Sequence, residues 1–291
     1  MPKNPVVVIT GATSGLGQLA AIDLAKRGFH LVLTARSRER ADATKQMIQG
    51  AHASAQVDFF YGDLSLMSEV KRIGQEIAAA HPVIDVLLNN AGIHAFKPRI
   101  TSEGFSEMIA VNYLAPWLLT HTLRTSLQHA GKAQVVNVAS EASRNHGVLR
   151  LPEDLTDTAS FTARGSSAIY GKTKLLNIMF NAELARQWAG TGICVNALNP
   201  GFNVTGLGRE IRYASVIERI LKLLHIGDPR RGAEIMTRLI VDAKYQEVTG
   251  GYVNVGTGNP IKPMHPGGDS AVQRKLWKAT EDLLSRKGYL K

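Results

Sequence analysis

The chain has 291 residues, of which 44% are hydrophobic, and this content is sufficient for a sizeable buried core. Its formal net charge of +10 would suit a polyanionic partner. However, the basic residues are scattered from Arg36 to Lys291 and are not interleaved with aromatic residues, so we expect no nucleic-acid partner. The single cysteine, Cys194, excludes an intrachain disulfide and falls in the apolar run ICVNAL, which predicts a buried strand.

No targeting or metal-binding pattern is visible in the sequence. The amino terminus passes from MPKNP directly into the apolar run VVVIT, without the basic and apolar regions of a signal peptide. No later run approaches the length of a membrane span. We therefore expect a cytoplasmic protein without a transmembrane segment. The nine histidines show no HExxH or other metal-ligand spacing, so the sequence predicts no metal site.

Short runs of valine, leucine and isoleucine recur along the chain and are continuous, as in strands that are buried on both faces. They are VVVIT from Val6, LVLT from Leu31, VDFFY from Val57, IDVLLNN from Ile84, AQVVNVAS from Ala133, ICVNALNP from Ile193 and GGYVNVG from Gly250. Helical segments are predicted at 16–27, 66–80, 102–128 and 167–188, with a final packing helix around 272–283. This alternation predicts an α/β fold, a doubly wound Rossmann domain whose seven-stranded, mostly parallel sheet has helices on both faces.

No linker, repeat or low-complexity tract divides the chain, so we expect one domain over residues 1–291. Within it, the stretch 209–226 has a wide apolar face interrupted by basic residues. A core helix, a membrane-contacting helix and a hydrophobic lid over a substrate all fit this pattern. Its position after a strand end supports a lid at about residues 203–226.

A glycine-rich loop joins the first predicted strand to the first predicted helix. Gly11, Gly15 and Gly17 stand in VVVITGATSGLGQLAAIDLAKRG. Glycine allows the backbone to turn sharply and to approach a pyrophosphate closely, while the helix N-terminus offers amide donors. The placement of this loop between strand and helix predicts a dinucleotide site.

The end of the second predicted strand favours NADP over NAD. In NAD-binding folds an acidic residue there holds the ribose hydroxyls, whereas an arginine accommodates the 2′-phosphate of NADP. Here the run continues LTARSRER, with Arg36 and no acidic residue directly after the strand. A solvated basic helix start is the structural alternative, but we expect Arg36 to bind the phosphate and the cofactor to be NADP(H).

Four motifs follow one another along the chain: the glycine loop, DVLLNNAG, VVNVAS and YGKTK. In this order they resemble the short-chain dehydrogenase/reductase family over nearly the whole length. Residues 10–17 are similar to the TGxxxGxG form of that family, 89–92 to its NNAG motif and 200–205 to its PGxxxT cofactor segment. Asp63 and Leu64 match its adenine-contacting position.

The resemblance implies a catalytic tetrad of Asn112, Ser140, Tyr170 and Lys174. Tyr170 would exchange a proton with the substrate as hydride moves to or from the nicotinamide, Ser140 would hydrogen-bond the substrate oxygen, and Lys174 would hold the nicotinamide ribose. The cofactor contacts implied are Gly11, Thr13, Ser14, Gly15, Leu16, Gly17, Arg36, Asp63, Leu64, Asn90, Ala91, Gly92, Tyr170, Lys174, Pro200, Gly201 and Thr205.

Tyr170 and Lys174 are four residues apart in SSAIYGKTKLLN, so their side chains share one face of the predicted helix. A free phenol has a pKa of about 10, and a neighbouring ammonium stabilises the phenolate. We therefore expect Lys174 to lower the pKa of Tyr170, as acid–base work near neutrality requires.

Pro116 lies four residues after Asn112 and has no N–H to donate to the Asn112 carbonyl. A kinked helix is the structural interpretation. The functional hypothesis is that this carbonyl binds an ordered water that leads to Lys174, in a proton relay of the kind that the family uses.

Ser140 and Tyr170 are 30 positions apart, which is longer than the usual family spacing and indicates an insertion at about residues 141–167. Together with the segments TSEGFSEMIAVNYLAPWLLT and AVQRKLWKATEDLL, this insertion makes the chain resemble the retinol-dehydrogenase-like branch of the family. That branch includes bacterial ketoreductases of the daunorubicin C-13 type. The resemblance implies a bulky lipophilic ketone, aldehyde or secondary alcohol as substrate. Arg144, Arg150 and Arg164 in the insertion would instead suit a polar group.

The main functional expectation is thus an NADP(H)-dependent carbonyl reductase or alcohol dehydrogenase. One alternative is an NADPH-binding sensor or scaffold without turnover, although all four tetrad residues are present. A second is an epimerase or dehydratase, which would consume no net hydride. The sequence is compatible with a homodimer and with a monomer.

Overall fold

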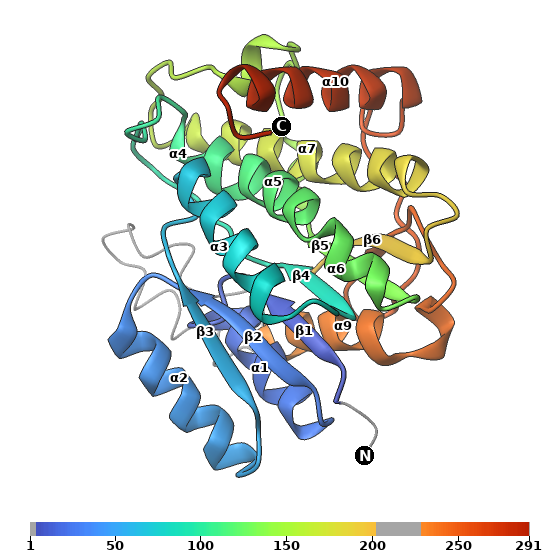
Figure 1. Cartoon of the computed structure of the whole chain (residues 1–291). Coiled ribbons are helices and arrows are strands. Elements are labelled where there is room, and N and C mark those ends of the chain that lie inside the picture. Colours follow the sequence, from blue (N-terminus) through green and yellow to red (C-terminus); the bar gives the residue numbers. More distant parts are fainter. Residues whose placement is uncertain (1–3, 202–227, 291) are drawn as a thin grey trace.

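The computed structural model describes residues 4–201 and 228–290 (Figure 1). Within them, seven strands form one sheet in the order β3-β2-β1-β4-β5-β6-β7, and every neighbouring pair is parallel. The strands are β1 Val6–Ile9, β2 His30–Ala35, β3 Val57–Tyr61, β4 Val86–Asn89, β5 Ala133–Val138, β6 Ile193–Asn199 and β7 Tyr252–Asn254. The predicted α/β fold with a seven-stranded parallel sheet is confirmed.

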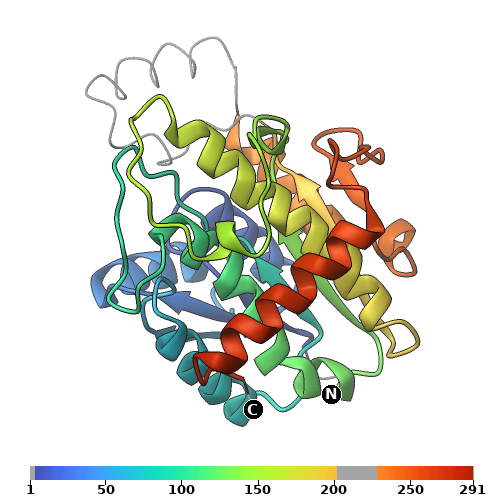
Figure 2. The ribbon, with the colours of Figure 1, turned by 90° about the horizontal axis from the view of Figure 1, so that it is seen from above.

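Two layers of helices cover the two faces of this sheet. One layer contains α1 Gly15–Lys26, α2 Arg38–Ala51 and α9 Pro229–Val241, whose apolar residues share a core with the sheet face that includes Val7 and Leu31. The other contains α3 Met67–Ala80, α5 Ala115–Thr122, α6 Arg124–His129 and α7 Ser166–Gln187, packed on the face that includes Val8 and Val32. Helix α10 Ser270–Arg286 lies across the outside of α7 (Figure 2).

Side-chain caps fix where several of these helices begin. Asp269 accepts hydrogen bonds from the backbone N–H groups of Ala271 and Val272 at the start of α10. Asp228 accepts one from Arg230 at the start of α9, where Pro229 occupies the first helical position. These carboxylates satisfy N–H groups that have no partner within the helix, and they face the positive end of its dipole.

The helix predicted over 102–128 is shorter and divided. It begins only with α4 Glu107–Ile109, because the preceding residues form a turn in which Gly104 has a φ of +82° and Ile100 forms a β-bridge with Ser106. A π-helical turn, Ala110–Leu114, then precedes α5, and α6 follows after Leu123. Pro116 stands at the start of α5, which is consistent with the interruption that the sequence predicted there.

Three further expectations concern individual segments. Cys194 lies on β6 as predicted, but its side chain is only half-buried, with Sγ 3.3 Å from the carbonyl oxygen of Gln246. The segment 141–167 contains two 3₁₀ turns, Glu141–Arg144 (η2) and Glu153–Leu155 (η3). The lid predicted at about 203–226 lies outside the described residues. Among the helices that the structure describes, none combines the length and the apolar character needed to cross a membrane.

Candidate active site

The predicted site residues gather along one edge of the sheet, where the parallel strands end. The glycine loop follows β1, Arg36 follows β2, Asp63 follows β3, residues 90–92 follow β4, and Pro200 follows β6. The strand order reverses between β1 and β4, because β1 is followed in sequence by β2 on one side and β4 lies on the other. In open α/β sheets, ligands bind in the crevice at such a switch point.

The glycine loop needs glycine for two separate reasons. Gly11 and Gly15 have φ values of +67° and +58°, a region that side chains disfavour. In addition, a Cβ at Gly11 would lie 2.9 Å from Ala91 Cα, and one at Gly17 would lie 2.4 Å from Asn90 Nδ2. The loop is therefore packed closely against the segment that follows β4.

Hydrogen bonds join these two loops across the switch point. The Thr10 hydroxyl accepts from the backbone N–H groups of Asn90 and Ala91, both at 3.0 Å. The Asn90 side-chain amide donates to the carbonyl oxygens of Thr10 at 2.8 Å and Gly11 at 3.2 Å. TGxxxGxG and NNAG are thus one connected structure, which fixes the shape of the loop at the start of α1.

Arg36 is exposed directly after the end of β2. A cleft lies beside the glycine loop. The cleft has a volume of about 440 Å³. It is lined by Thr13, Ser14, Gly15, Gln18, Arg40, Ala43, Thr44 and Met47. Two predicted cofactor residues with hydroxyl groups, Thr13 and Ser14, therefore face open space together with the guanidinium-bearing side chain of Arg40.

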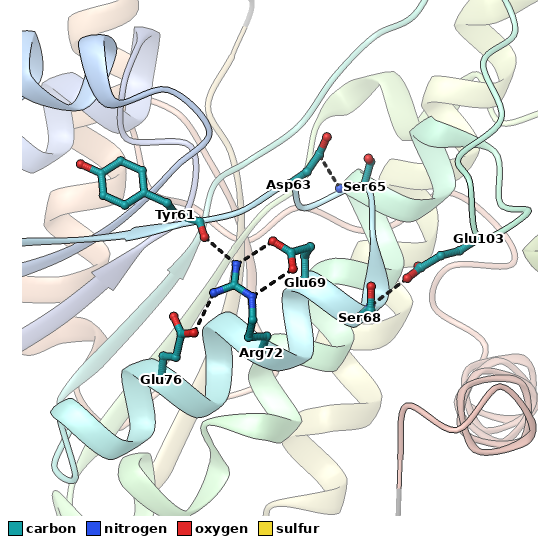
Figure 3. Close-up of polar contacts among 8 residues, drawn as sticks. All are labelled: Tyr61, Asp63, Ser65, Ser68, Glu69, Arg72, Glu76 and Glu103. Carbon is teal, nitrogen blue, oxygen red and sulfur yellow. Dashed lines mark hydrogen bonds and ion pairs between the residues drawn. The ribbon is translucent and has the colours of Figure 1, made fainter.

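Asp63 lies in a set of polar contacts between the end of β3 and α3 (Figure 3). Asp63 accepts a hydrogen bond from the N–H of Ser65 at 2.9 Å, which forms a tight turn. Arg72 donates to the carbonyl oxygen of Tyr61 at 2.7 Å, and Glu69 and Glu76 hold its guanidinium on the other side. This pairing raises the pKa of Arg72 and lowers that of Glu69.

The phenol of Tyr170 lies between Ser140 and an aromatic ring. Ser140 directly follows the β5 region, and its hydroxyl accepts from the N–H of Ala142 at 3.1 Å and also hydrogen-bonds Tyr170. The imidazole of His94 stacks on the Tyr170 ring, with centroids 4.7 Å apart and an interplanar angle of 14°. His94 Nε2 is 3.0 Å from the hydroxyl of Ser166, one turn before Tyr170 on α7.

The protonation of Tyr170 differs from the sequence-based expectation. Burial raises its pKa to about 12, and the hydrogen bond from Ser140 offsets only part of this shift. Lys174 Nζ is 5.7 Å from the centroid of the phenol ring and donates to the carbonyl oxygen of Val138 at 2.9 Å. The ammonium of Lys174 is therefore hydrogen-bonded to the Val138 carbonyl, and the largest effect on the pKa of the Tyr170 phenol is its burial away from water.

Lys174 is itself strongly affected by burial. Its side chain is 3% exposed, and the loss of hydration lowers its pKa to about 8. A Cβ on Gly92 would lie 3.3 Å from Lys174 Nζ and 3.5 Å from Asn112 Oδ1. Gly92 thus leaves the space in which the lysine and the asparagine approach the segment after β4.

Asn112 connects three parts of the site through its side chain. Oδ1 accepts from the N–H of Ile93 at 2.8 Å, while Nδ2 donates to the carbonyl of Ile93 at 2.9 Å and to the hydroxyl of Thr173 at 3.0 Å. Asn112 is fully buried in the π-helical turn before α5. The turn therefore aligns the loop after β4 with α7, next to Tyr170 and Lys174.

The remaining predicted contacts lie after β6. Gly201 has a φ of +78°, and its N–H donates to Asn199 Oδ1 at 3.1 Å, so the chain turns sharply after Pro200. Thr205 lies outside the described residues. Two residues near the site were not predicted from the sequence. They are His94, whose only sequence signal is its position two residues after the NNAG motif, and Gly171, which packs against the backbone of residues 142–145.

The chain is similar to known proteins of one enzyme family. Residues 5–151 match the family model described as short chain dehydrogenase. Human retinol dehydrogenase 13 is 29% identical over 96% of the chain and 84% of its own length, and mouse retinol dehydrogenase 14 is 31% identical over 96% and 85%. Human polyprenol dehydrogenase is 28% identical over 97% and 86%.

Solved structures show the same fold. A putative NAD(P)-dependent gluconate 5-dehydrogenase from Beutenbergia cavernae with bound NADP is 26% identical and superposes with a TM-score of 0.67 over 87% of this chain and 95% of that one. L-sorbose reductase from Gluconobacter frateurii is 21% identical with a TM-score of 0.69 over 90% and 98%. The chain is therefore an oxidoreductase of the short-chain dehydrogenase/reductase family, and it belongs to the retinol-dehydrogenase-like branch.

Proposed function

We propose that the protein transfers a hydride between NADP(H) and a bulky lipophilic ketone, aldehyde or secondary alcohol, with Tyr170 as general acid and base. The observation that carries this proposal is the arrangement at Tyr170. Its phenol hydrogen-bonds Ser140, and the buried Lys174 lies on the same side of α7. Three groups thus lie together beside the nucleotide crevice. Tyr170 would donate a proton to the substrate oxygen, Ser140 would hydrogen-bond the same oxygen, and Lys174 supplies a positive charge.

The crevice fits a dinucleotide, and the bound nicotinamide would supply or accept the hydride. The glycine loop lies between β1 and the N-terminus of α1, where a pyrophosphate binds in dinucleotide folds, and Gly11 and Gly17 allow this loop to pack closely against the segment after β4. Arg36 favours NADP because no carboxylate follows β2 directly. NADP is also the nucleotide in the structure of the gluconate 5-dehydrogenase relative.

The protonation state of Tyr170 favours reduction near neutral pH. With a pKa of about 12, the phenol is neutral and can donate its proton to the carbonyl oxygen that receives negative charge. Ser140 would donate a hydrogen bond to that oxygen and stabilise the charge. Lys174, with a pKa of about 8, is mostly protonated at pH 7 and would stabilise the resulting phenolate and bind the ribose hydroxyls.

Asn112 acts in this proposal as a positioning residue. Its side chain holds Ile93 and Thr173, and Thr173 in turn donates to the carbonyl of Tyr170 at 2.7 Å. Pro116 cannot donate to the Asn112 carbonyl, which leaves that oxygen for a water that would lead toward Lys174. Such a water would return a proton to the lysine and tyrosine after each turnover.

The relatives and the site support a lipophilic substrate. The curated relatives include retinol and polyprenol dehydrogenases, whose named alcohols are long and apolar. In this chain, His94 stacks on Tyr170 and also contacts the ring of Phe96, with centroids 4.5 Å apart. Arg144 and Arg150, which suggested a polar substrate, are engaged in ion pairs with Glu141 and Asp154.

We also propose that residues 1–291 form one domain.

The test is NADPH oxidation by the purified protein with a panel of bulky aromatic, steroidal and retinoid carbonyls. The Tyr170→Phe variant should lose turnover by at least about 10²-fold, the usual contribution of a positioned acid, while NADPH binding is retained. Tyr289→Phe is the matched control, because it removes a phenol from the segment after α10. Its turnover should equal that of the parent chain.

Two other outcomes would replace the proposal. Tight NADPH binding without turnover on any panel member would favour a sensor or scaffold. Conversion of a substrate without net NADPH oxidation would favour an epimerase or dehydratase. Equal binding of NADH and NADPH would refute the cofactor assignment without affecting the assignment of Tyr170.

A further inference from the structure

Two imidazoles and one carboxylate meet at the edge of the sheet opposite to the glycine loop. His30 is the first residue of β2, Asp58 is the second residue of β3, and His81 directly follows α3. One ligand atom from each of the three side chains can be chosen so that all three atoms lie within 4.8 Å of one another. Since parallel strands begin at this edge, the cluster is separate from the proposed active site.

The strand register explains why these residues meet. Val32 of β2 pairs with Asp58 of β3, and His30 precedes Val32 by two residues, so His30 and Asp58 point to the same face of the sheet. Val32 packs in one core with Ile73 and Ile77 of α3, which identifies this face as the one that α3 covers. The end of α3 then brings His81 to the same place.

Both imidazoles turn the same nitrogen toward one carboxylate oxygen. Nε2 of His30 is 2.7 Å from Asp58 Oδ2, and Nε2 of His81 is 3.3 Å from that oxygen. In a tetrahedral zinc site with bonds of about 2.0–2.1 Å, neighbouring ligand atoms lie about 3.3 Å apart. The two distances to Asp58 Oδ2 therefore match such a site once the hydrogen bond between His30 and Asp58 opens by about half an ångström, and the third ligand–ligand distance is below 4.8 Å.

The surroundings favour a cation with water-accessible positions. The side chains of His30 and His81 are 21% and 10% exposed, so they are well held, whereas that of Asp58 is 49% exposed. His81 caps the C-terminus of α3 through its N–H, which donates to the carbonyl of Ile77 at 2.7 Å. The negative end of the α3 dipole therefore adds to the charge of the carboxylate.

We propose that His30, Asp58 and His81 form a binding site for a divalent transition cation of the zinc class, with water as the remaining ligand. Two imidazole nitrogens and one carboxylate oxygen suit Zn²⁺, whereas Mg²⁺ and Ca²⁺ prefer sets made only of oxygen atoms. The ion joins the edge strand β3 to β2 and to the end of α3. The sequence shows no metal-ligand spacing for these residues, because the three side chains come from three separate elements.

The experiment is calorimetric titration of ZnCl₂, and separately MgCl₂, into the full chain without a histidine tag. The parent protein should bind Zn²⁺ at a saturable site with a stoichiometry of one and should show no matching isotherm with Mg²⁺. Asp58→Asn and the double variant His30→Gln with His81→Gln should each weaken this binding at least tenfold. His52→Gln is the matched control, because this half-buried histidine hydrogen-bonds the nearby Ser54 and should leave the site unchanged.

Unchanged Zn²⁺ affinity in Asp58→Asn and in the double variant would overturn the proposal, as would equal loss of affinity in His52→Gln. If the variants fail to fold, Co²⁺ bound to the parent protein provides a second measurement. One equivalent of Co²⁺ should give the visible absorption of a four- or five-coordinate ion and should be displaced by one equivalent of Zn²⁺. Absence of this absorption at saturating Co²⁺ would also overturn the proposal.

Discussion

Arg36 is exposed directly after β2, so its side chain can be removed without disturbing the core. A charge-assisted hydrogen bond contributes about 1.5–3 kcal/mol. We therefore expect Arg36→Ala to weaken NADPH binding by roughly 10- to 100-fold and to leave NADH binding unchanged. Fluorescence titration with both nucleotides measures this difference. Arg27→Ala, at an exposed site paired with Asp23, should bind both as the parent does, and a parallel loss there would argue against a specific phosphate contact.

Lys174 is expected to reduce the stability of the fold while it serves the site. Its pKa falls from 10.5 in the unfolded chain to about 8 in the folded one, so the unfolded state binds more protons between these two pH values. The cost of burying the charge is complete below pH 8 and disappears as the pH rises to 10.5. Lys174→Met should therefore raise the free energy of unfolding at pH 7 by about 1–3 kcal/mol, with loss of turnover.

Denaturant unfolding of both proteins at pH 7 and at pH 10 measures this effect. The advantage of Lys174→Met should shrink toward zero at the higher pH. Lys45→Met, on the exposed side of α2, provides the control and should show no such dependence on pH. A variant that is less stable than the parent at pH 7 would contradict the argument.

At the scale of elements, Gly171 sets the fit between α7 and the turn that follows Ser140. A Cβ at this position would lie 2.4 Å from the carbonyl oxygen of Ala142 and 2.3 Å from that of Asn145. Because both are backbone atoms, Gly171→Ala must displace η2 and with it the hydrogen bond between Ser140 and Tyr170. We expect a loss of about 1–3 kcal/mol in stability and at least a tenfold lower kcat/KM.

Thermal unfolding and steady-state kinetics of Gly171→Ala test this expectation together. Gly50→Ala on α2 is the matched control, since no atom lies within 4 Å of the added Cβ. Its stability should rise by about 0.5–1 kcal/mol because alanine favours a helix, while its kinetics stay unchanged. Parent-like kinetics in Gly171→Ala would show that η2 can move without affecting the site.

The sequence predicted elements well where the signal was local. Continuous apolar runs located the seven strands that the structure describes, and the helix expected at 167–188 is α7, Ser166–Gln187. The helix expected at 102–128 was partly wrong, because residues 101–106 form a local turn at Gly104 and because the π-helical turn before Pro116 contacts distant residues. Asn112, for example, is held there by Ile93 and Thr173.

Motifs predicted which residues of the candidate site lie close together, but they did not determine its electrostatics. The glycine loop, NNAG, VVNVAS and YGKTK occur in an order from which the proximity of Tyr170 to Ser140 and Lys174 could be predicted. The pKa of Tyr170 was expected to fall and instead rises, because its value depends on burial and on the direction in which Lys174 points. His94 was missed for the same reason, since its stacking partner lies in a different part of the chain.

At the scale of the whole molecule, α10 closes an aromatic cluster between α5 and α7. Trp277 of α10 lies 5.5 Å from Trp117 and 6.1 Å from Phe180, measured between ring centroids. The hydroxyl of Tyr113 and that of Thr280 are 2.7 Å apart in the buried interface. The C-terminal helix is therefore part of the main core, and the stability of the molecule depends on how these rings pack.

His121 makes this cluster sensitive to acid. It stacks on Trp117 with centroids 3.6 Å apart, and burial lowers its pKa to about 4, although its Nδ1 lies 2.7 Å from the Trp117 carbonyl oxygen. The unfolded chain takes up the proton near pH 6.5, whereas the folded chain does so only near pH 4. Stability contributed by neutral His121 is therefore complete above pH 6.5 and falls by roughly 3 kcal/mol as the pH decreases to 4.

Denaturant unfolding between pH 7 and pH 4 tests this prediction on the parent and on His121→Gln. Glutamine can still donate to the Trp117 carbonyl but takes up no proton, so the variant should lose less stability over this range even if it starts from a lower value at pH 7. His52→Gln, which removes a half-buried imidazole outside the aromatic cluster, should keep the acid sensitivity of the parent. If His121→Gln lost as much stability as the parent, the acid sensitivity would arise outside the aromatic cluster.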